Sequence, residues 1–104
     1  MATFHHYGVP TTEKHENEIY LEEAKVHLTD SAAHPYGVEF LRFDADSPLP
    51  KEIQTQTHAG FMVDSVDEAI KGQKVILEPF NATDELRVAF IMDGGALIEV
   101  METR

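Results

Sequence analysis

The chain contains two copies of a short pattern, His-x-Gly followed by an apolar residue, and this repeat constrains its fold more than any other feature. The copies are His6–Val9 (His-Tyr-Gly-Val) and His58–Phe61 (His-Ala-Gly-Phe). Each copy is followed several dozen residues later by a glutamate within a short apolar run, Glu39 after the first copy and Glu99 after the second. The chain is therefore expected to consist of two related modules.

The length of 104 residues fits one domain whose two halves share a core. We expect a single domain over residues 1–104, with module one at about 1–46, a linker at about 47–56 and module two at about 57–104. A polar stretch containing Pro48 and Pro50 indicates the linker, because proline interrupts helices and strands. The apolar content of 42% is that of an ordinary folded domain.

The second half carries the clearer signals of secondary structure. Asp64 and Ser65 can cap a short helix, and acidic residues follow them near its positive N-terminal end. Asp93–Gly95 is typical of a tight turn, and Pro79 is expected to end a strand. The predicted order is strand (57–63), helix (66–71), strand (74–77), strand (86–92) and strand (96–101).

The first half predicts the same order with its helix lost or shortened. The charged stretch 13–23 is expected to be a loop containing at most one helical turn, and 30–37 has the composition of a turn. The strands are predicted over residues 3–9, 24–29 and 38–43.

The charge of the chain excludes several classes of partner. Acidic residues outnumber basic ones, 19 to 8, which gives a formal net charge of −11. Such a surface repels phosphate backbones, and no basic stripe with interleaved aromatic residues is present, so nucleic acid is not an expected partner.

No apolar run reaches the ~20 residues of a membrane span, and no signal peptide is evident. The absence of cysteine excludes disulfides and thiol nucleophiles. We expect a cytoplasmic protein without membrane contact.

The repeated histidines and glutamates are suited to binding a metal ion. Residues two apart on a strand share a face, so each glycine leaves open space beside its histidine. A carboxylate in the middle of an apolar strand needs a cation or a hydrogen-bond partner. Imidazole and carboxylate groups suit Zn, Ni, Fe, Co or Mn. We therefore predict that one divalent metal ion is held by His6, Glu39, His58 and Glu99, although any one of them alone would be interpreted as a hydrogen-bonded structural residue. The histidines interpreted as surface or structural residues are His15, His27 and His34.

At these residues the chain resembles the vicinal oxygen chelate superfamily, which includes glyoxalase I, bleomycin-resistance proteins, fosfomycin-resistance enzymes, extradiol dioxygenases and methylmalonyl-CoA epimerase. The resemblance is strongest over Thr57–Glu102. There His58–Ile70 is similar to the family's strand-helix opening, and Arg87–Glu102 is similar to its closing hairpin. The first half is similar only at His6–Val9 and Val38–Leu41.

The resemblance implies an α+β fold of two βαβββ modules that form a curved mixed sheet with an open cleft, the first module being short and lacking its helix. It also implies that metal ligands come from the first and last strands of each module. Carried over by position, these are His6, Glu39, His58 and Glu99, a set similar to the two-His, two-Glu shell of glyoxalase-type isomerases and epimerases. The eroded first module departs from the family pattern, which leaves the identity of the substrate open.

The function implied is that of a metal-dependent, glyoxalase-like lyase, isomerase or epimerase. The metal would act as a Lewis acid on a substrate with two neighbouring oxygens, and Glu99 or Glu39 would act catalytically by moving a proton. One alternative is a metal-free protein of the same fold that binds a small molecule, as bleomycin-resistance relatives do. Another is an extradiol-type Fe(II) dioxygenase, although such enzymes typically present two His and one Glu.

Two further expectations concern partners. A small-molecule substrate and a C2 homodimer are expected, because two modules in so short a chain leave sheet edges and apolar faces that a second copy could cover. Arg42 and Arg87 are candidate contacts for an anionic substrate, with surface salt bridges as the alternative role.

Overall fold

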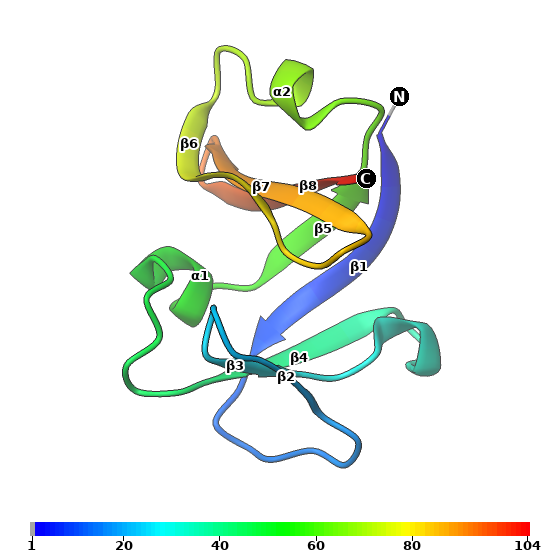
Figure 1. The fold of residues 1–104 in the computed structure, drawn as a ribbon, viewed down its shortest axis with the longest axis vertical. Coiled ribbons are helices and arrows are strands. Elements are labelled where there is room, and N and C mark those ends of the chain that lie inside the picture. Colours follow the sequence, from blue (N-terminus) through cyan, green and yellow to red (C-terminus); the bar gives the residue numbers. More distant parts are fainter. Residues whose placement is uncertain (1) are drawn as a thin grey trace. The chain divides into compact units, whose positions relative to one another are not determined.

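The computed structural model describes residues 2–104 and has the α+β composition expected from the sequence (Figure 1). Contacts divide the chain into two compact units. The first half is His6–Thr57, and the second half is His58–Arg104 together with the N-terminal residues up to His5. The elements of the described residues are β1 (Thr3–Pro10), β2 (Ile19–Leu21), β3 (Val26–Leu28), a 3-10 turn (Ser31–Ala33), β4 (Val38–Phe43), α1 (Lys51–Thr55), β5 (His58–Met62), α2 (Val66–Ala69), β6 (Lys74–Asn81), β7 (Leu86–Asp93) and β8 (Ala96–Thr103).

The second half follows the predicted order of strand, helix and three strands. Its strands lie in the order β5-β8-β7-β6. The β5 and β8 strands are parallel, whereas β7 is antiparallel to both of its neighbours. The β7 strand is buried on both faces over Val88–Ile91, which is why its sequence is a continuous apolar run.

Helix α2 covers one face of β7 and β8 in the second half (Figure 1). Of the two predicted capping residues, Asp64 and Ser65, Ser65 is the N-cap, and its side chain accepts a hydrogen bond from the Glu68 N–H. Val66 is fully buried and packs with Ala89 and Val100, and these three form the centre of an apolar cluster. A four-residue helix has little stability of its own, so this packing holds it in place.

The turn between β7 and β8 confirms the prediction made from the sequence. Asp93 and Ala96 are paired, so Gly94 and Gly95 are the two central residues of the hairpin. Both glycines have positive φ, 56° and 90°, which is the backbone that a primed two-residue turn requires and that glycine adopts without strain.

The prediction that Pro79 ends its strand is wrong. Strand β6 continues through Pro79 to Asn81. It lies at the end of the strand order, where a missing N–H costs no ladder hydrogen bond on the open side. Its pairing with β7 shifts register between Val75 and Leu77 and again between Leu77 and Phe80, and such irregularities accommodate a proline at an edge.

The first half has the strand order β2-β3-β4-β1, with β1 and β4 parallel and β3 antiparallel to β2 and β4. No helix lies between β1 and β2, as expected for a module that has lost it. The interpretation of residues 13–23 as a loop is wrong in one part, because Ile19–Leu21 forms β2 by pairing with β3. The sequence of this short edge strand has no alternation of apolar and polar residues. Its pairing with β3 therefore defines the strand, and the local sequence does not.

The linker contains a helix that the sequence did not predict. Helix α1 starts after Pro50 and is anchored by Ile53, whose side chain is buried. Five residues are too few for a hydrophobic period to be recognised, so composition alone indicated a loop. Neither helix within residues 2–104 has the length and apolar character needed to cross a bilayer.

The packing of α2 leads to a prediction about stability. We expect Val66→Ala to lower the free energy of unfolding by roughly 2 kcal/mol, because it removes methyl groups from a fully buried position. Val75→Ala, at a half-buried position of the edge strand β6, is the matched control and should cost clearly less. Urea denaturation of the three proteins gives the comparison; equal losses would contradict the central role of Val66.

Candidate functional site

The first half brings His6 and Glu39 together through the register of two parallel strands. Gly8 on β1 lies directly opposite Glu39 on β4. His6 is two residues before Gly8 and therefore shares its face, and glycine has no side chain to stand between the imidazole and the carboxylate. The His6 Nε2 lies 3.6 Å from the Glu39 Oε1. His6 is buried, whereas the side chain of Glu39 is 22% exposed.

The second half repeats this arrangement with His58 and Glu99. Gly60 on β5 lies directly opposite Glu99 on β8, which is again a parallel pair. The His58 Nε2 lies 3.1 Å from the Glu99 Oε1, within hydrogen-bond distance. His58 is buried, and the side chain of Glu99 is 13% exposed.

The two pairs thus share one geometry that the order of residues only suggested. In each half, the glycine of His-x-Gly is the direct cross-strand partner of the glutamate. Each half therefore offers one buried imidazole and one partly buried carboxylate on the same face of its sheet. A pair of this kind either forms a hydrogen bond that orients the histidine or supplies two ligands to a metal ion.

The surroundings of the two pairs differ. Phe90 on β7 is the cross-strand neighbour of Glu99, and its ring meets the His58 ring edge to face, with centroids 5.0 Å apart. In the first half, β3 ends at Leu28, opposite Leu41, and does not reach the position beside Glu39. The second pair is therefore packed from a third strand, which agrees with the lower exposure of its carboxylate.

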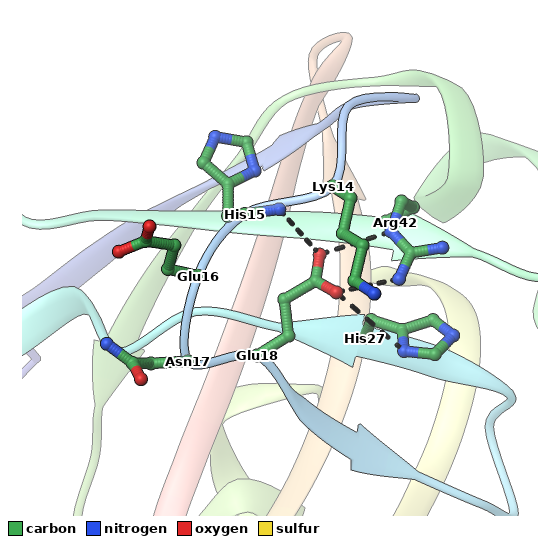
Figure 2. Close-up of a pocket in the computed structure, with 7 residues that line it drawn as sticks. All are labelled: Lys14, His15, Glu16, Asn17, Glu18, His27 and Arg42. Carbon is green, nitrogen blue, oxygen red and sulfur yellow. Dashed lines mark hydrogen bonds and ion pairs between the residues drawn. The ribbon is translucent and has the colours of Figure 1, made fainter.

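A second polar cluster, which the sequence did not indicate, lies in the first half around Glu18 (Figure 2). The Arg42 Nη2 donates to the Glu18 Oε1 at 2.7 Å, and the Nε donates to Oε2 at 3.1 Å. The Glu18 side chain is only 7% exposed, and its Oε2 also accepts a hydrogen bond from the His15 N–H. Glu18 precedes β2 in the segment that was expected to be a loop, so only the fold reveals this contact.

His27 extends the cluster across the sheet. On β3 it is the cross-strand neighbour of Arg42, and its Nδ1 lies 4.0 Å from the Glu18 Oε1. Its Nε2 lies 3.1 Å from the Asp44 Oδ1, and the Asp44 Oδ2 accepts a hydrogen bond of 2.8 Å from the Tyr20 hydroxyl. Five side chains from β2, β3, β4 and the adjoining loops are thereby connected.

These contacts shift the acidity of the carboxyl groups. The hydrogen bonds from Arg42 lower the pKa of Glu18 from 4.5 to about 2, against the opposing effect of burial. The pKa of Asp44 is also lowered, chiefly by the hydrogen bond from Tyr20 and further by His27, again against burial. Both carboxylates therefore remain ionised in the folded protein well into the acid range.

Arg87 on β7 holds the position in the second half that His27 on β3 holds in the first. It is the cross-strand neighbour of Glu102, which is the third residue after Glu99, just as Arg42 is the third after Glu39. The Arg87 guanidinium lies 3.0 Å from Asp67 of α2 and 3.4 Å from Glu102. Both candidate anion contacts named from the sequence, Arg42 and Arg87, are thus engaged in ion pairs.

No protein-family model and no curated protein matches the chain in sequence. Among solved structures, the fold is similar to that of hypothetical protein BH1468 from Bacillus halodurans C-125, with a TM-score of 0.71 and 22% sequence identity. The similarity covers 99% of this chain and 95% of that protein. At this identity the likeness establishes a shared fold.

The Glu18 cluster predicts a specific dependence of stability on pH. Glu18→Gln should lower the free energy of unfolding at neutral pH, because it removes the carboxylate that Arg42 binds. The pKa of Glu18 is lower in the folded state, so its contribution is fully present above the usual value of 4.5 and is lost as the pH falls toward about 2. Urea denaturation at successive pH values should show the two proteins converging over that range.

Asp67→Asn is the matched control for this experiment. Asp67 also pairs with an arginine, but its side chain is 67% exposed, so solvent screens the interaction. This variant should differ little from wild type at any pH. A constant offset between wild type and Glu18→Gln down to pH 2 would contradict the assignment of the lowered pKa.

Proposed function

We propose that this chain is a metal-dependent enzyme of glyoxalase type, in which His6, Glu39, His58 and Glu99 bind one divalent metal ion. The observation that supports this most is the matched register of the two halves, which sets a histidine beside a glutamate twice in the same way. A structural hydrogen bond would explain one such pair, but two equivalent pairs in otherwise different surroundings favour a shared role.

The donor set fits a divalent transition metal. His6, Glu39 and His58 each offer one ligand atom of a kind that could hold a metal ion. Glu99 completes a set of two imidazoles and two carboxylates, which suits Zn, Ni, Fe, Co or Mn. The histidines are buried and held by their strands, so the ligands are oriented before an ion binds.

The proposed chemistry is proton transfer in a small substrate that carries two neighbouring oxygens. A bound metal ion supplies Lewis acidity, which makes a hydrogen on the adjacent carbon more acidic. A glutamate within reach of that carbon accepts the proton and returns it, which gives isomerase, epimerase or lyase chemistry. This substrate class follows from the resemblance to vicinal oxygen chelate proteins, and the likeness to the Bacillus halodurans structure supports the fold on which it depends.

Glu39 is the better candidate for the proton-transferring residue. Its carboxylate lies farther from its histidine than that of Glu99 does, at 3.6 Å against 3.1 Å, and it is the more exposed of the two. Glu99 is flanked by Phe90 and is held more closely. We therefore assign Glu99 chiefly to ligand binding and Glu39 to proton transfer.

A homodimer belongs to the same proposal. Ile19 and Tyr36 are large apolar or aromatic side chains with high exposure, at 61% and 79%, and a second copy would remove such surface from water.

Metal content provides the direct test of the site. Protein purified without an affinity resin should contain one divalent metal ion per chain, and Glu99→Gln should weaken metal affinity by at least about tenfold. Glu78→Gln, at an exposed position on β6, is the matched control and should retain the ion. Substoichiometric metal in the wild type, or unchanged metal in Glu99→Gln, would refute the site.

The proposed reaction has a test that does not require the natural substrate. When hydroxyacetone is incubated in D2O with metal-loaded protein, hydrogen on the carbon beside the carbonyl should exchange for deuterium. NMR follows this exchange. Glu39→Gln should slow this exchange by about 100-fold or more, because it removes the proton acceptor. Exchange at the wild-type rate in this variant would exclude Glu39, and ligand-induced rises in Tm that persist after chelation, without exchange, would favour a metal-free binding protein.

A further inference from the structure

The first half contains a hollow of about 720 Å³ on the face of β4 that carries Arg42 (Figure 2). It is lined by residues 14–18 of the loop before β2, together with His27 and Arg42. Side chains alternate along a strand, so Arg42 and Phe40 lie on the opposite face of β4 from Glu39. The hollow is therefore separate from the His6–Glu39 pair.

The hollow lies on the face of β4 that corresponds to the face of β8 covered by α2. In the second half, α2 covers the face of β8 that carries Val100, the residue after Glu99. The matching residue of β4 is Phe40, and two imidazole rings contact it: His15 is stacked on it with ring centroids 4.4 Å apart, and His34 meets it edge to face at 6.0 Å. The first half thus replaces a helix by a loop on this face.

The lining of the hollow favours a polar occupant. All seven of its residues carry charged, amide or imidazole side chains, whereas α2 meets an apolar surface in the second half. Burying such groups against an apolar segment would leave them without hydrogen-bond partners, which is costly. A small polar molecule suits the hollow better than a helix of a partner protein.

Arg42, which lines the hollow, retains hydrogen-bond donors for an oxyanion. Glu18 takes its Nε–H and one Nη2–H and so fixes the plane of the guanidinium. A guanidinium has five N–H donors, and within residues 2–104 this one makes no other hydrogen bond, so three donors remain. Because Glu18 already fixes the Arg42 side chain, ligand binding there costs no further side-chain conformational entropy.

Lys14 supplies a second cation. It lines the same hollow, is exposed, and forms no ion pair with any residue in the described part of the chain. Of the two carboxylates in the lining, Glu18 is neutralised by Arg42, and Figure 2 shows Glu16 directed away from the guanidinium. The lining therefore holds one guanidinium that is already paired with Glu18 and one lysine without an ion pair, in a chain whose net charge is −11.

We propose that this hollow is a binding site for a small molecule bearing an oxyanion, either a carboxylate or a phosphate. The outer N–H groups of Arg42 bind the oxygens, and the Lys14 ammonium adds a charge-assisted hydrogen bond. The site does not depend on the proposed metal ion, because none of its residues belongs to the two His–Glu pairs.

The test is titration of the full chain with succinate and, separately, with inorganic phosphate at constant ionic strength, followed by amide NMR shifts. One or both probes should produce saturable shifts in residues 14–18 and around Arg42, and the stronger of the two identifies the preferred group. Lys14→Gln should weaken that binding by about tenfold, because it removes one charge-assisted contact. Lys74→Gln, an exposed lysine on β6, is the matched control and should bind as the wild type does.

Two further variants separate the possible explanations. Arg42→Gln should abolish binding, and because it also leaves Glu18 without its cation, its fold is verified by NMR before the result is used. His58→Ala, which removes a proposed metal ligand, should leave oxyanion binding unchanged, so this site and the metal site succeed or fail separately. Shifts that do not saturate with either probe, wild-type affinity in Lys14→Gln, or an equal loss in Lys74→Gln would overturn the proposal.

Discussion

The parallel register between the strand with the histidine and the strand with the glutamate is the constraint on which the rest of each half depends. Parallel strands cannot be joined by a hairpin, so the chain must cross over, and the intervening residues form the other two strands. A slip of one residue would turn the glutamate to the opposite face. Glycine opposite the glutamate leaves the approach of the imidazole unobstructed. Each half is thus built around one histidine and one carboxylate.

In each half, the face of the sheet opposite the histidine and the glutamate is covered by other residues, and the interactions that hold this cover differ between the halves. In the second half, Val66 of α2 packs on Ala89 and Val100, and burial of apolar surface supplies the stabilisation. In the first half, Glu18 from a loop binds Arg42. In both halves an acidic residue of the crossover segment meets an arginine of the sheet, but only in the first is that acid nearly buried. A charged contact in the first half thus takes the place that α2 has in the second.

The sequence predicted those parts of the molecule whose signal is local or repeated. The double glycine after Asp93 and the apolar run of β7 were correctly interpreted, because one φ requirement or one buried strand determines each. The repeat identified one histidine and one glutamate in each half, and their contact within each half came from the strand register. By contrast, β2 exists only because β3 pairs with it, and the Glu18–Arg42 contact joins residues far apart in the chain. Neither leaves a pattern that a reader of one sequence can recognise.

These differences imply that the two halves respond differently to acid. The cover of the first half depends on ionised Glu18 and Asp44, whose pKa values are lowered by the partners that they hold. Once those carboxyls are protonated, the arginine and histidine of the cluster lose their counter-charges and the loop loses its attachment to the sheet. The apolar cluster under α2 contains no group that titrates. The carboxylates that also attach α2 to its sheet, Asp67 and Glu102, are more exposed than Glu18, so solvent screens their contacts more. Acid should therefore loosen the first half before the second. The first half is also the one whose paired glutamate, Glu39, is more exposed than its counterpart Glu99.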